Sequence, residues 1–254
     1  MKLSVSITAF NGVPLIRKCL ESVQWADEII VVDSGSTDNT REIARELGAR
    51  VTQTPDFPGY GQQKNRALDR TTGDWVLALD HDEWVSPALR AEIEAVIRDP
   101  DAKAAYAMPR SSNFCGRYMR HAGWWRFSED HLHDRILVTG ETGRLKNPLH
   151  HEPMPTLEHV INKMNGYSSA GAKFNFERGK RASLLKAIFH GGWAFLRTYV
   201  LQAGFLDGRE GFMLSVSNAE GTYYRYLKLC CWATNAREQI RRDSRAHGGD
   251  RDHL

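Results

Sequence analysis

Cysteine is scarce in this chain, and its distribution argues against two classes of protein. The four cysteines, Cys19, Cys115, Cys230 and Cys231, are scattered apart from one adjacent pair that cannot easily form a bridge. They do not supply the disulfide framework of a small secreted domain. The spacing of Cys and His that is typical of a zinc site is missing as well. We therefore expect a reducing, cytoplasmic protein.

The chain also lacks a strong net charge and a long uncharged apolar run. The formal net charge of +3 is too small to indicate nucleic acid, and we find no nucleic-acid recognition motif. Lys2 precedes an alternating strand pattern rather than the apolar region of a signal peptide. The most apolar stretch, 184–201, contains Lys186, His190 and Arg197, whereas a membrane-spanning helix needs about 20 largely uncharged residues. The sequence therefore predicts neither a signal peptide nor a membrane-spanning helix.

Strand and helix patterns alternate through the first 80 residues. With 254 residues, 41% of them hydrophobic, the chain can bury a substantial core. Short apolar runs predict strands at 3–10, 28–32, 50–53 and 75–79. Helical spacing predicts helices at 14–22, 39–47 and 62–70. Because strands joined by helices form parallel sheets with right-handed crossovers, we expect an α/β fold with a mostly parallel sheet and flanking helices.

Acidic residues stand at the ends of two of these strands. Asp33 follows the strand at 28–32, and Asp80-His81-Asp82 follows the strand at 75–79. Open α/β sheets bind ligands at the carboxyl ends of their strands. Neighbouring carboxylates repel unless a positive charge lies among them, and such oxygen ligands suit Mg²⁺ or Mn²⁺. An isolated D-x-D is more often a solvated turn, but this setting favours a metal site that holds a phosphorylated substrate.

Four segments recur in the order and at the separations of a known family. They read S-I-T-A-F-N, V-V-D-S-G-S-T-D-N-T, G-Q-Q-K-N-R-A-L and L-A-L-D-H-D-E. Together they resemble the family 2 glycosyltransferases, which have the GT-A fold, and the resemblance covers residues 1 to roughly 155. The sequence is most similar to the bacterial lipopolysaccharide-core β-1,4-glucosyltransferase branch. That similarity extends to Gly123-Trp124-Trp125, to residues 204–208 and to Gly211-Phe212.

The resemblance implies a role for each matching residue. Residues expected to contact the nucleotide sugar are Thr8, Ala9, Phe10, Asn11, Asp33, Ser34, Ser36, Lys64, Asp80 and His81. The strand end at 8–11 and Asp33 would hold the uracil and ribose of a UDP-sugar, with Ser34, Gly35 and Ser36 close by. Lys64 would face the diphosphate or the Asp33 side of the pocket, although exposed lysines are common. Asp80 would contact the ribose or a metal-bound water, and Asp82 would coordinate the divalent metal.

The chain departs from this branch at two places. The family usually has a small residue between the two aspartates, where this chain has His81. In strand geometry, His81 points away from the carboxylates' face, which suits a residue behind the metal ligands. In the acceptor region, the branch more often has W-Y-P-D-x-Q-L-R-L-F. Here residues 124–137 read W-W-R-F-S-E-D-H-L-H-D-R-I-L, so the usual glutamine is missing.

An inverting glycosyl transfer needs a general base close to the acceptor hydroxyl. A carboxylate takes the proton of that hydroxyl, while the metal neutralises the leaving diphosphate. Glu129 and Asp130 lie about where GT-A enzymes place this base. We favour Asp130, then Glu129; Asp134 comes third and suits a partner for Arg135. A polar loop without a catalytic role is the alternative.

Two adjacent histidines are further candidates for the metal site. Leu149-His150-His151-Glu152 follows an expected β segment at 135–138. Either His150 or His151 could complete the site around Asp82, because imidazole serves as a ligand in some GT-A enzymes. Adjacent histidines are equally well explained as surface or core residues, so both interpretations stay open.

From Thr156 onward the sequence predicts helices, at 162–176, 184–201 and 221–236. The helix at 184–201 suits the membrane interface, with Arg178, Lys180 and Arg181 near anionic head groups. Packing of the same helix on the GT-A domain is nearly as well supported. We expect a GT-A nucleotide-sugar-binding and catalytic domain at 1–155, a helical acceptor and membrane-proximal region at 156–236, and a flexible tail at 237–254.

The expected function is inverting, metal-dependent transfer of a hexose, glucose from UDP-glucose, to a lipopolysaccharide-core or other lipid-linked saccharide. The enzyme would act from the cytoplasm, peripherally on the inner face of the cell membrane. One alternative is a polyprenyl-phosphate or exopolysaccharide sugar transferase of the same fold. Another is a nucleotide-sugar-binding protein that has lost catalysis. A nucleotidyltransferase would usually have a glycine- and basic-rich loop after the first strand, where this chain has Asn11-Gly12-Val13-Pro14.

Overall fold

The computed structural model describes residues 1–127 and 138–248. The chain divides into two compact units, which are described separately. The first comprises residues 1–113 and 124–153, and the second comprises residues 114–123 and 154–254. The expected three-part division of the chain stays a prediction.

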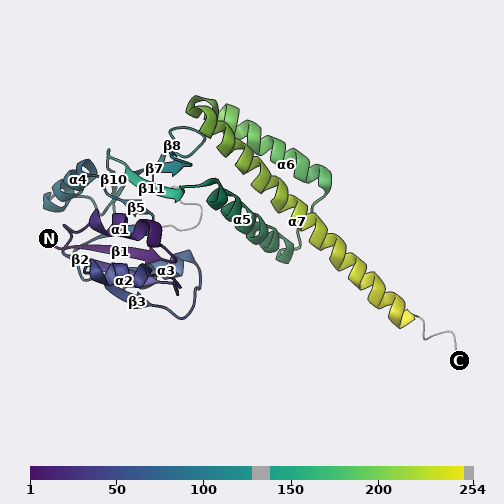
Figure 1. Cartoon of the computed structure of the whole chain (residues 1–254), viewed down its shortest axis with the longest axis horizontal. Helices are drawn as coiled ribbons and strands as arrows, with labels where there is room; N and C mark the ends of the chain where they lie inside the picture. The colour runs from purple at the N-terminus through teal and green to yellow at the C-terminus, as the bar shows by residue number, and fades with distance from the viewer. Residues whose placement is uncertain (128–137, 249–254) are drawn as a thin grey trace. The chain divides into compact units, whose positions relative to one another are not determined.

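A four-stranded parallel sheet forms the centre of the first unit, in the order β3-β2-β1-β4. Its strands are β1 (Leu3–Ala9), β2 (Glu28–Asp33), β3 (Arg50–Gln53) and β4 (Trp75–Asp80). The helices α1 (Val13–Glu21), α2 (Thr40–Glu46) and α3 (Tyr60–Leu68) connect them (Figure 1). All seven elements were predicted, with bounds that differ by at most two residues, and the α/β fold class with its flanking helices is confirmed.

Central strand β1 is buried on both of its faces. Val5 and Ile7 are fully buried in the apolar core. Ser4 is buried too, and its hydroxyl donates a hydrogen bond of 2.6 Å to Glu28 and accepts one of 2.9 Å from the Gly73 N–H. A buried hydroxyl is tolerated because both of its bonds are made. This burial holds β1 in register with its neighbours, β2 and β4.

The remainder of the first unit adds one helix and several short strands. They are β5 (Glu83–Trp84), α4 (Pro87–Arg98), β6 (Ala105–Ala107), β7 (Pro109–Phe114), β9 (Arg126–Phe127), β10 (Thr142–Arg144) and β11 (Leu149–Met154). Strand β11 lies between β5 and β7, and it is antiparallel to β5. The segment 149–152 was expected to follow a strand and instead forms one. Most of the strand expected at 135–138 lies outside the described residues.

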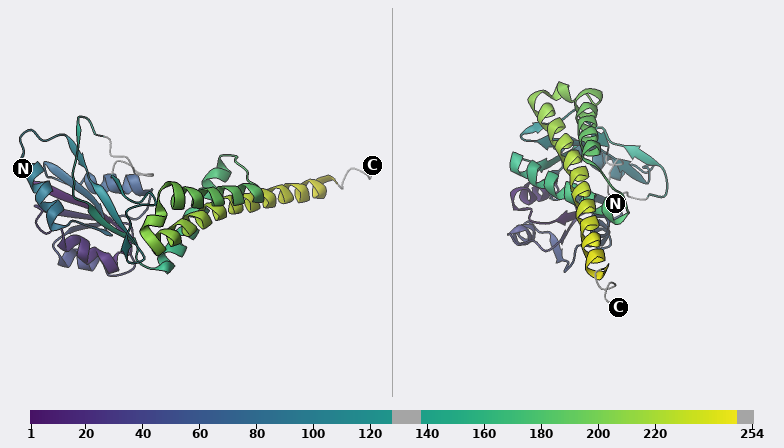
Figure 2. Two further views of the ribbon diagram at one scale, coloured as in Figure 1. Left: turned by 90° about the horizontal axis from the view of Figure 1, so that it is seen from above. Right: turned by 90° about the vertical axis from the view of Figure 1, so that its right-hand side faces the viewer.

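Helices make up most of the second unit. They are α5 (Leu157–Glu177), α6 (Leu184–Leu196), a π-helical turn (Arg197–Leu201), a 3₁₀ turn (Gly204–Asp207) and α7 (Gly208–Gly248), after the short strand β8 (Arg117–Tyr118). Both α5 and α6 lie along α7 (Figures 1 and 2). Helix α5 begins before the expected residue because Thr156 caps it, accepting a hydrogen bond from the His159 N–H. Within the described part of the chain, every helix is too short or too polar to span a membrane.

Asp207 connects two segments of the second unit that are distant in sequence. Its carboxylate is 2% exposed and accepts hydrogen bonds from the N–H groups of Arg120 and His121, at 3.2 and 2.8 Å. The His121 Nδ1 atom lies 3.1 Å away. A Cβ added to Gly211 would collide with the Gly204 carbonyl oxygen, so the two backbones are in close contact here. Residues near two of the motifs that carry the sequence resemblance therefore meet around this carboxylate.

Replacing this carboxylate should destabilise the second unit. Asp207→Asn keeps the size of the side chain but turns an amide donor toward N–H groups that need acceptors. We expect a loss of about 2 kcal/mol in the free energy of unfolding, measured by urea denaturation. Glu220→Gln, which alters an exposed acid on α7, is the control and should change it little. Equal stability of the two variants would contradict the role given to Asp207.

Candidate functional site

The ends of β1, β2 and β4 form one polar edge of the central sheet. The register pairs Ala9 with Asp33 on one side of β1 and Thr8 with Asp80 on the other. Because all three strands are parallel, their carboxyl ends meet here, as the sequence predicted. The side chains that follow these strands are therefore candidates for one shared site.

Asp80 is neutralised by a lysine from α3. Lys64 Nζ lies 3.2 and 3.3 Å from the two carboxylate oxygens of Asp80, and Thr8 donates a hydrogen bond of 3.1 Å to one of them. Both members of the ion pair are 29% exposed, so solvent and solutes can reach them. Lys64 was expected to face the diphosphate or the Asp33 side of the pocket; in the structure it faces Asp80.

Asp33 organises the loop that follows β2. The carboxylate is fully buried and accepts hydrogen bonds from the Gly35 and Ser36 N–H groups, at 3.1 and 2.9 Å, and from the Ser36 hydroxyl. Gly35 has φ +94°, a conformation that side chains disfavour. Arg41 Nε lies 3.9 Å from the carboxylate. These contacts show how Asp33 shapes the loop; its contact with uracil and ribose stays a prediction.

The loops after β1 and β2 are joined by hydrogen bonds. The Asn11 N–H donates to the Ser36 hydroxyl at 2.8 Å, and the Thr37 N–H donates to the Asn11 side-chain oxygen at 2.9 Å. Phe10 is 54% exposed beside them. On α3, Gln63 donates to the Ser34 hydroxyl at 3.0 Å. Gln63 stands in the G-Q-Q-K-N segment, yet no role was expected for it, because the residues that it contacts are far away in sequence.

Asp82 lies beside one of the two candidate histidines. His151 Nε2 is 3.6 Å from the Asp82 carboxylate, and His151 Nδ1 is 2.9 Å from the Ser112 hydroxyl. The Glu152 N–H also donates to the Asp82 carbonyl at 2.9 Å, which holds β11 against this turn. Ser112 on β7 was not predicted, although a residue that orients a ligand histidine is a usual part of a metal site.

His150 lies in a different environment from His151. Its ring stacks on Trp84 with 5.5 Å between ring centroids, and Lys18 Nζ lies 3.3 Å from the centroid of the Trp84 ring. Burial, together with the nearby Lys18 charge, lowers the pKa of His150. Neighbouring residues of a strand point to opposite faces. The structure therefore brings His151, and not His150, to Asp82.

Glu83 supports the turn from inside the protein. It is 2% exposed, accepts a hydrogen bond of 2.8 Å from the Asp80 N–H, and lies 2.8 Å from the Arg110 guanidinium. Burial raises the pKa of Glu83, an effect that Arg110 opposes.

Two further side chains lie close to this turn. Burial, reinforced by the nearby carboxylates, raises the pKa of the Cys19 thiol, whose sulfur lies 3.6 Å from the Asp80 carbonyl. The His81 ring lies next to Gly12, where an added Cβ would be 2.6 Å from Cδ2.

Asp82 and His151 suit a metal ion whose remaining ligands come from the substrate. Among the described side chains, those of residues 1–125 and 138–234, no three His, Cys, Asp or Glu form a site for a metal ion. Mg²⁺, however, is commonly held by one or two carboxylates together with substrate phosphates and water. Asp82 supplies such a carboxylate, and the His151 imidazole beside it can act as a further ligand. The proposed bases Glu129 and Asp130, and the third candidate Asp134, lie outside the described residues.

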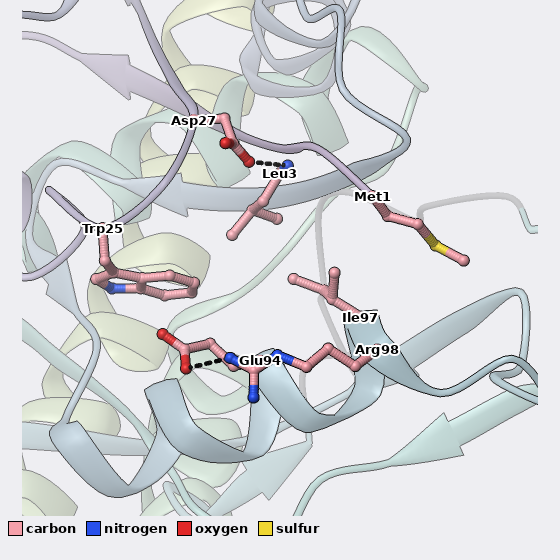
Figure 3. A pocket seen from close by; sticks show the side chains of 7 residues that line it. All are labelled: Met1, Leu3, Trp25, Asp27, Glu94, Ile97 and Arg98. Carbon is pink, nitrogen blue, oxygen red and sulfur yellow. Dashed lines mark hydrogen bonds and ion pairs between the residues drawn. The ribbon is translucent and has the colours of Figure 1, made fainter.

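A hollow of about 520 Å³ lies at the opposite end of the sheet. Figure 3 shows its lining residues, which are Met1, Leu3, Trp25, Asp27, Glu94, Ile97 and Arg98. Asp27 accepts a hydrogen bond of 2.7 Å from the Leu3 N–H, and Glu94 pairs with Arg98 at 3.0 Å. This hollow is near the amino end of β1 and contains none of the predicted site residues, so we do not assign the active site to it.

Comparison with known proteins places the chain in a family. The family described as Glycosyl transferase family 2 matches residues 4–156. The chain is 32% identical to the uncharacterized glycosyltransferase RP128 of Rickettsia prowazekii (strain Madrid E), over 90% of this chain and 86% of that protein. It is 29% identical to the lipopolysaccharide core biosynthesis glycosyltransferase LpsC of Rhizobium meliloti (strain 1021), over 90% of this chain and 92% of that protein.

Among solved structures, the chain is similar to S. aureus TarS 1-349 in complex with UDP. The two are 26% identical, with a TM-score of 0.41, over 48% of this chain and 39% of that one. The match over residues 4–156 and the relatives of similar length carry the assignment. The chain belongs to glycosyl transferase family 2 and is a glycosyltransferase.

Proposed function

We propose that this enzyme transfers a hexose, with inversion, from a UDP-sugar to a lipid-linked saccharide. The donor is UDP-glucose, and the acceptor is a lipopolysaccharide core or a related saccharide at the cytoplasmic face of the membrane. The observation that carries the proposal is the Asp82–His151 pair beside the Lys64–Asp80 ion pair at the carboxyl edge of the sheet. The name of the LpsC relative supports the choice of acceptor.

The nucleotide would bind over the loops that follow β1 and β2. These loops are held together by Asn11, Ser36 and Thr37, so they present backbone groups in a fixed arrangement. Lys64 supplies the positive charge that a diphosphate requires, and its partner Asp80 sets its position. A cationic group fixed before the substrate arrives stabilises developing negative charge without reorganisation.

Asp82 and His151 would hold the divalent cation, Mg²⁺ or Mn²⁺. When bound, this cation neutralises negative charge on the diphosphate leaving group. The hydrogen bond to Ser112 determines which nitrogen of His151 is left to bind the cation. If His151 Nδ1–H donates to the Ser112 oxygen, then Nε2 keeps its lone pair and faces Asp82. One hydrogen bond at Nδ1 thus prepares Nε2 as a ligand.

Asp130 is the proposed general base, with Glu129 as the second choice. The acceptor hydroxyl oxygen attacks the anomeric carbon from the face opposite the diphosphate. A bond from this oxygen to carbon forms, the bond from carbon to the diphosphate oxygen breaks, and the carboxylate takes the hydroxyl proton. Inversion follows because attack and departure occur on opposite faces of the sugar.

The donor can be identified by thermal stabilisation and slow hydrolysis across UDP-, GDP- and dTDP-sugars, with Mg²⁺, Mn²⁺ or EDTA. We expect UDP-glucose to raise the melting temperature and to be hydrolysed only with metal, since a ligand stabilises the fold that binds it. Asp82→Asn should lose both effects of the metal, whereas Asp69→Asn, an exposed acid at the end of α3, should retain them. Failure of every nucleotide sugar to bind would reject the proposal.

The two histidines provide a matched pair of variants. His151→Gln should weaken the apparent affinity for Mn²⁺ about tenfold or more, because a ligand beside Asp82 is lost. His150→Gln should leave the affinity close to that of the wild type. The affinity is measured from the Mn²⁺ dependence of UDP binding. An equal loss of Mn²⁺ affinity in the two variants would show that His151 contributes no more to metal binding than His150. That result would contradict the proposed ligand set.

Asp130→Asn tests the proposed base. The amide cannot accept the proton, so the transfer rate should fall about 10²-fold or more, while the affinity for the donor stays unchanged. Asp134→Asn is the matched control in the same segment and should have a smaller effect. If Asp134→Asn reduced the rate as much as Asp130→Asn, the assignment of the base to Asp130 would be wrong.

A further inference from the structure

Helix α6 packs through its smallest residues. The residues that it buries are Ala187, Gly191 and Ala194, and buried Thr198 continues the same side into the π-helical turn. A Cβ added to Gly191 would lie 3.1 Å from Tyr223 Cβ of α7. A contact this close requires small side chains, so α6 and α7 approach each other closely along this side.

The large apolar residues of α6 lie on the outer side instead. Leu185, Phe189, Trp193 and Leu196 recur every three or four residues and therefore form one stripe, and Phe189 is 75% exposed. Other exposed apolar residues flank or continue this stripe: Leu184, Ile188, Val200 and Leu201. In a helix of a water-soluble protein, large apolar residues normally face the core. Here that arrangement is reversed, which indicates that the outer face has a partner.

The segment around this stripe has only positive formal charges. Residues 178–206 contain no Asp or Glu and five basic residues. These are Arg178, Lys180, Arg181, Lys186 and Arg197, all of them exposed. The Arg178 and Arg181 guanidinium groups lie 3.8 and 4.8 Å from the ring centroids of Phe174 and Phe176. The partner of this face should therefore combine an apolar interior with an anionic surface.

We infer that the outer face of α6 and of the π-helical turn that follows it, from Leu184 to Leu201, binds the surface of an anionic lipid bilayer. Leucine, phenylalanine and tryptophan side chains would enter the boundary between head groups and acyl chains, while the basic side chains contact the head groups. Long basic side chains such as Lys186 and Arg197 can extend from an apolar face to reach the charged surface. The helix would lie in the interface, since no described helix can span the membrane.

Charge favours a bilayer over a second copy of the chain on this face. Two copies would bring the same five cations together, which opposes association unless acidic residues compensate them, and residues 178–206 contain none. Anionic lipids supply that compensation across the whole face. The inference deepens the proposed function and rests on it for the nature of the acceptor, because an enzyme held at the bilayer would reach acceptors anchored there.

Sedimentation with lipid vesicles tests this surface, using the full chain without donor or acceptor. The protein should sediment with equimolar phosphatidylcholine and phosphatidylglycerol, and much less with phosphatidylcholine alone. Raised salt should weaken the binding, because it screens the basic residues. Phe189→Ser should bind about tenfold more weakly, from the lost burial of one aromatic side chain. Leu68→Ser, which alters an exposed leucine of α3, is the control and should bind like the wild type.

A second variant separates charge from apolar burial. Lys180→Glu with Arg181→Glu should lose most of the preference for anionic vesicles. Circular dichroism should show that all the variants are folded, since every altered side chain is exposed. The inference fails if the wild type ignores anionic vesicles or if Phe189→Ser binds them as well as the wild type. It also fails if light scattering shows a dimer that Phe189→Ser dissociates while neither protein binds lipid.

The two proposals can fail separately. Hydrolysis of UDP-glucose in solution needs no membrane, so an enzyme that hydrolyses the donor but ignores vesicles would overturn only the membrane inference. A protein that binds anionic vesicles but no nucleotide sugar would overturn only the proposed function. Phe189→Ser should hydrolyse the donor at the wild-type rate, because Phe189 belongs to the second unit, whereas the residues assigned to the donor belong to the first.

Discussion

The parallel register around β1 is the constraint on which the candidate site depends. β1 is buried on both faces and pairs in parallel with β2 and β4, so the residues that end the three strands must lie at one edge. A shift of one residue would turn every side chain of a strand to the opposite face. The positions of Asp33 and Asp80 are therefore a consequence of how the core packs.

This edge accommodates three carboxylates within four residues of sequence because each has a different partner. Asp80 pairs with Lys64 from α3, Asp82 lies beside His151 from β11, and buried Glu83 lies beside Arg110 from β7. Uncompensated carboxylates this close would be costly to hold together. Glu83 supports the turn from inside the protein, whereas Asp80 and Asp82 are partly exposed at the edge of the sheet.

In the second unit, α6 buries small residues rather than large ones. Small residues of α6 allow close contact with α7, and the large apolar residues that would normally fill a core are exposed. Buried Asp207 meanwhile joins the turn before α7 to residues 120–121. The large apolar residues of α6 are thus exposed, while buried residues such as Leu214 and Leu229, together with polar and close backbone contacts, hold the unit together.

The sequence by itself determined the order of strands and helices through residue 80, the acidic strand ends and the family. These depend on local periodicity and on short motifs, which neighbouring residues specify. Only the tertiary structure decided that Lys64 faces Asp80, that His151 rather than His150 meets Asp82, and that Ser112 and Gln63 take part. It also decided which face of α6 is buried. The physical reason is that each of these contacts joins side chains from different elements, and their distance and orientation follow from the packing of the elements rather than from spacing along the chain.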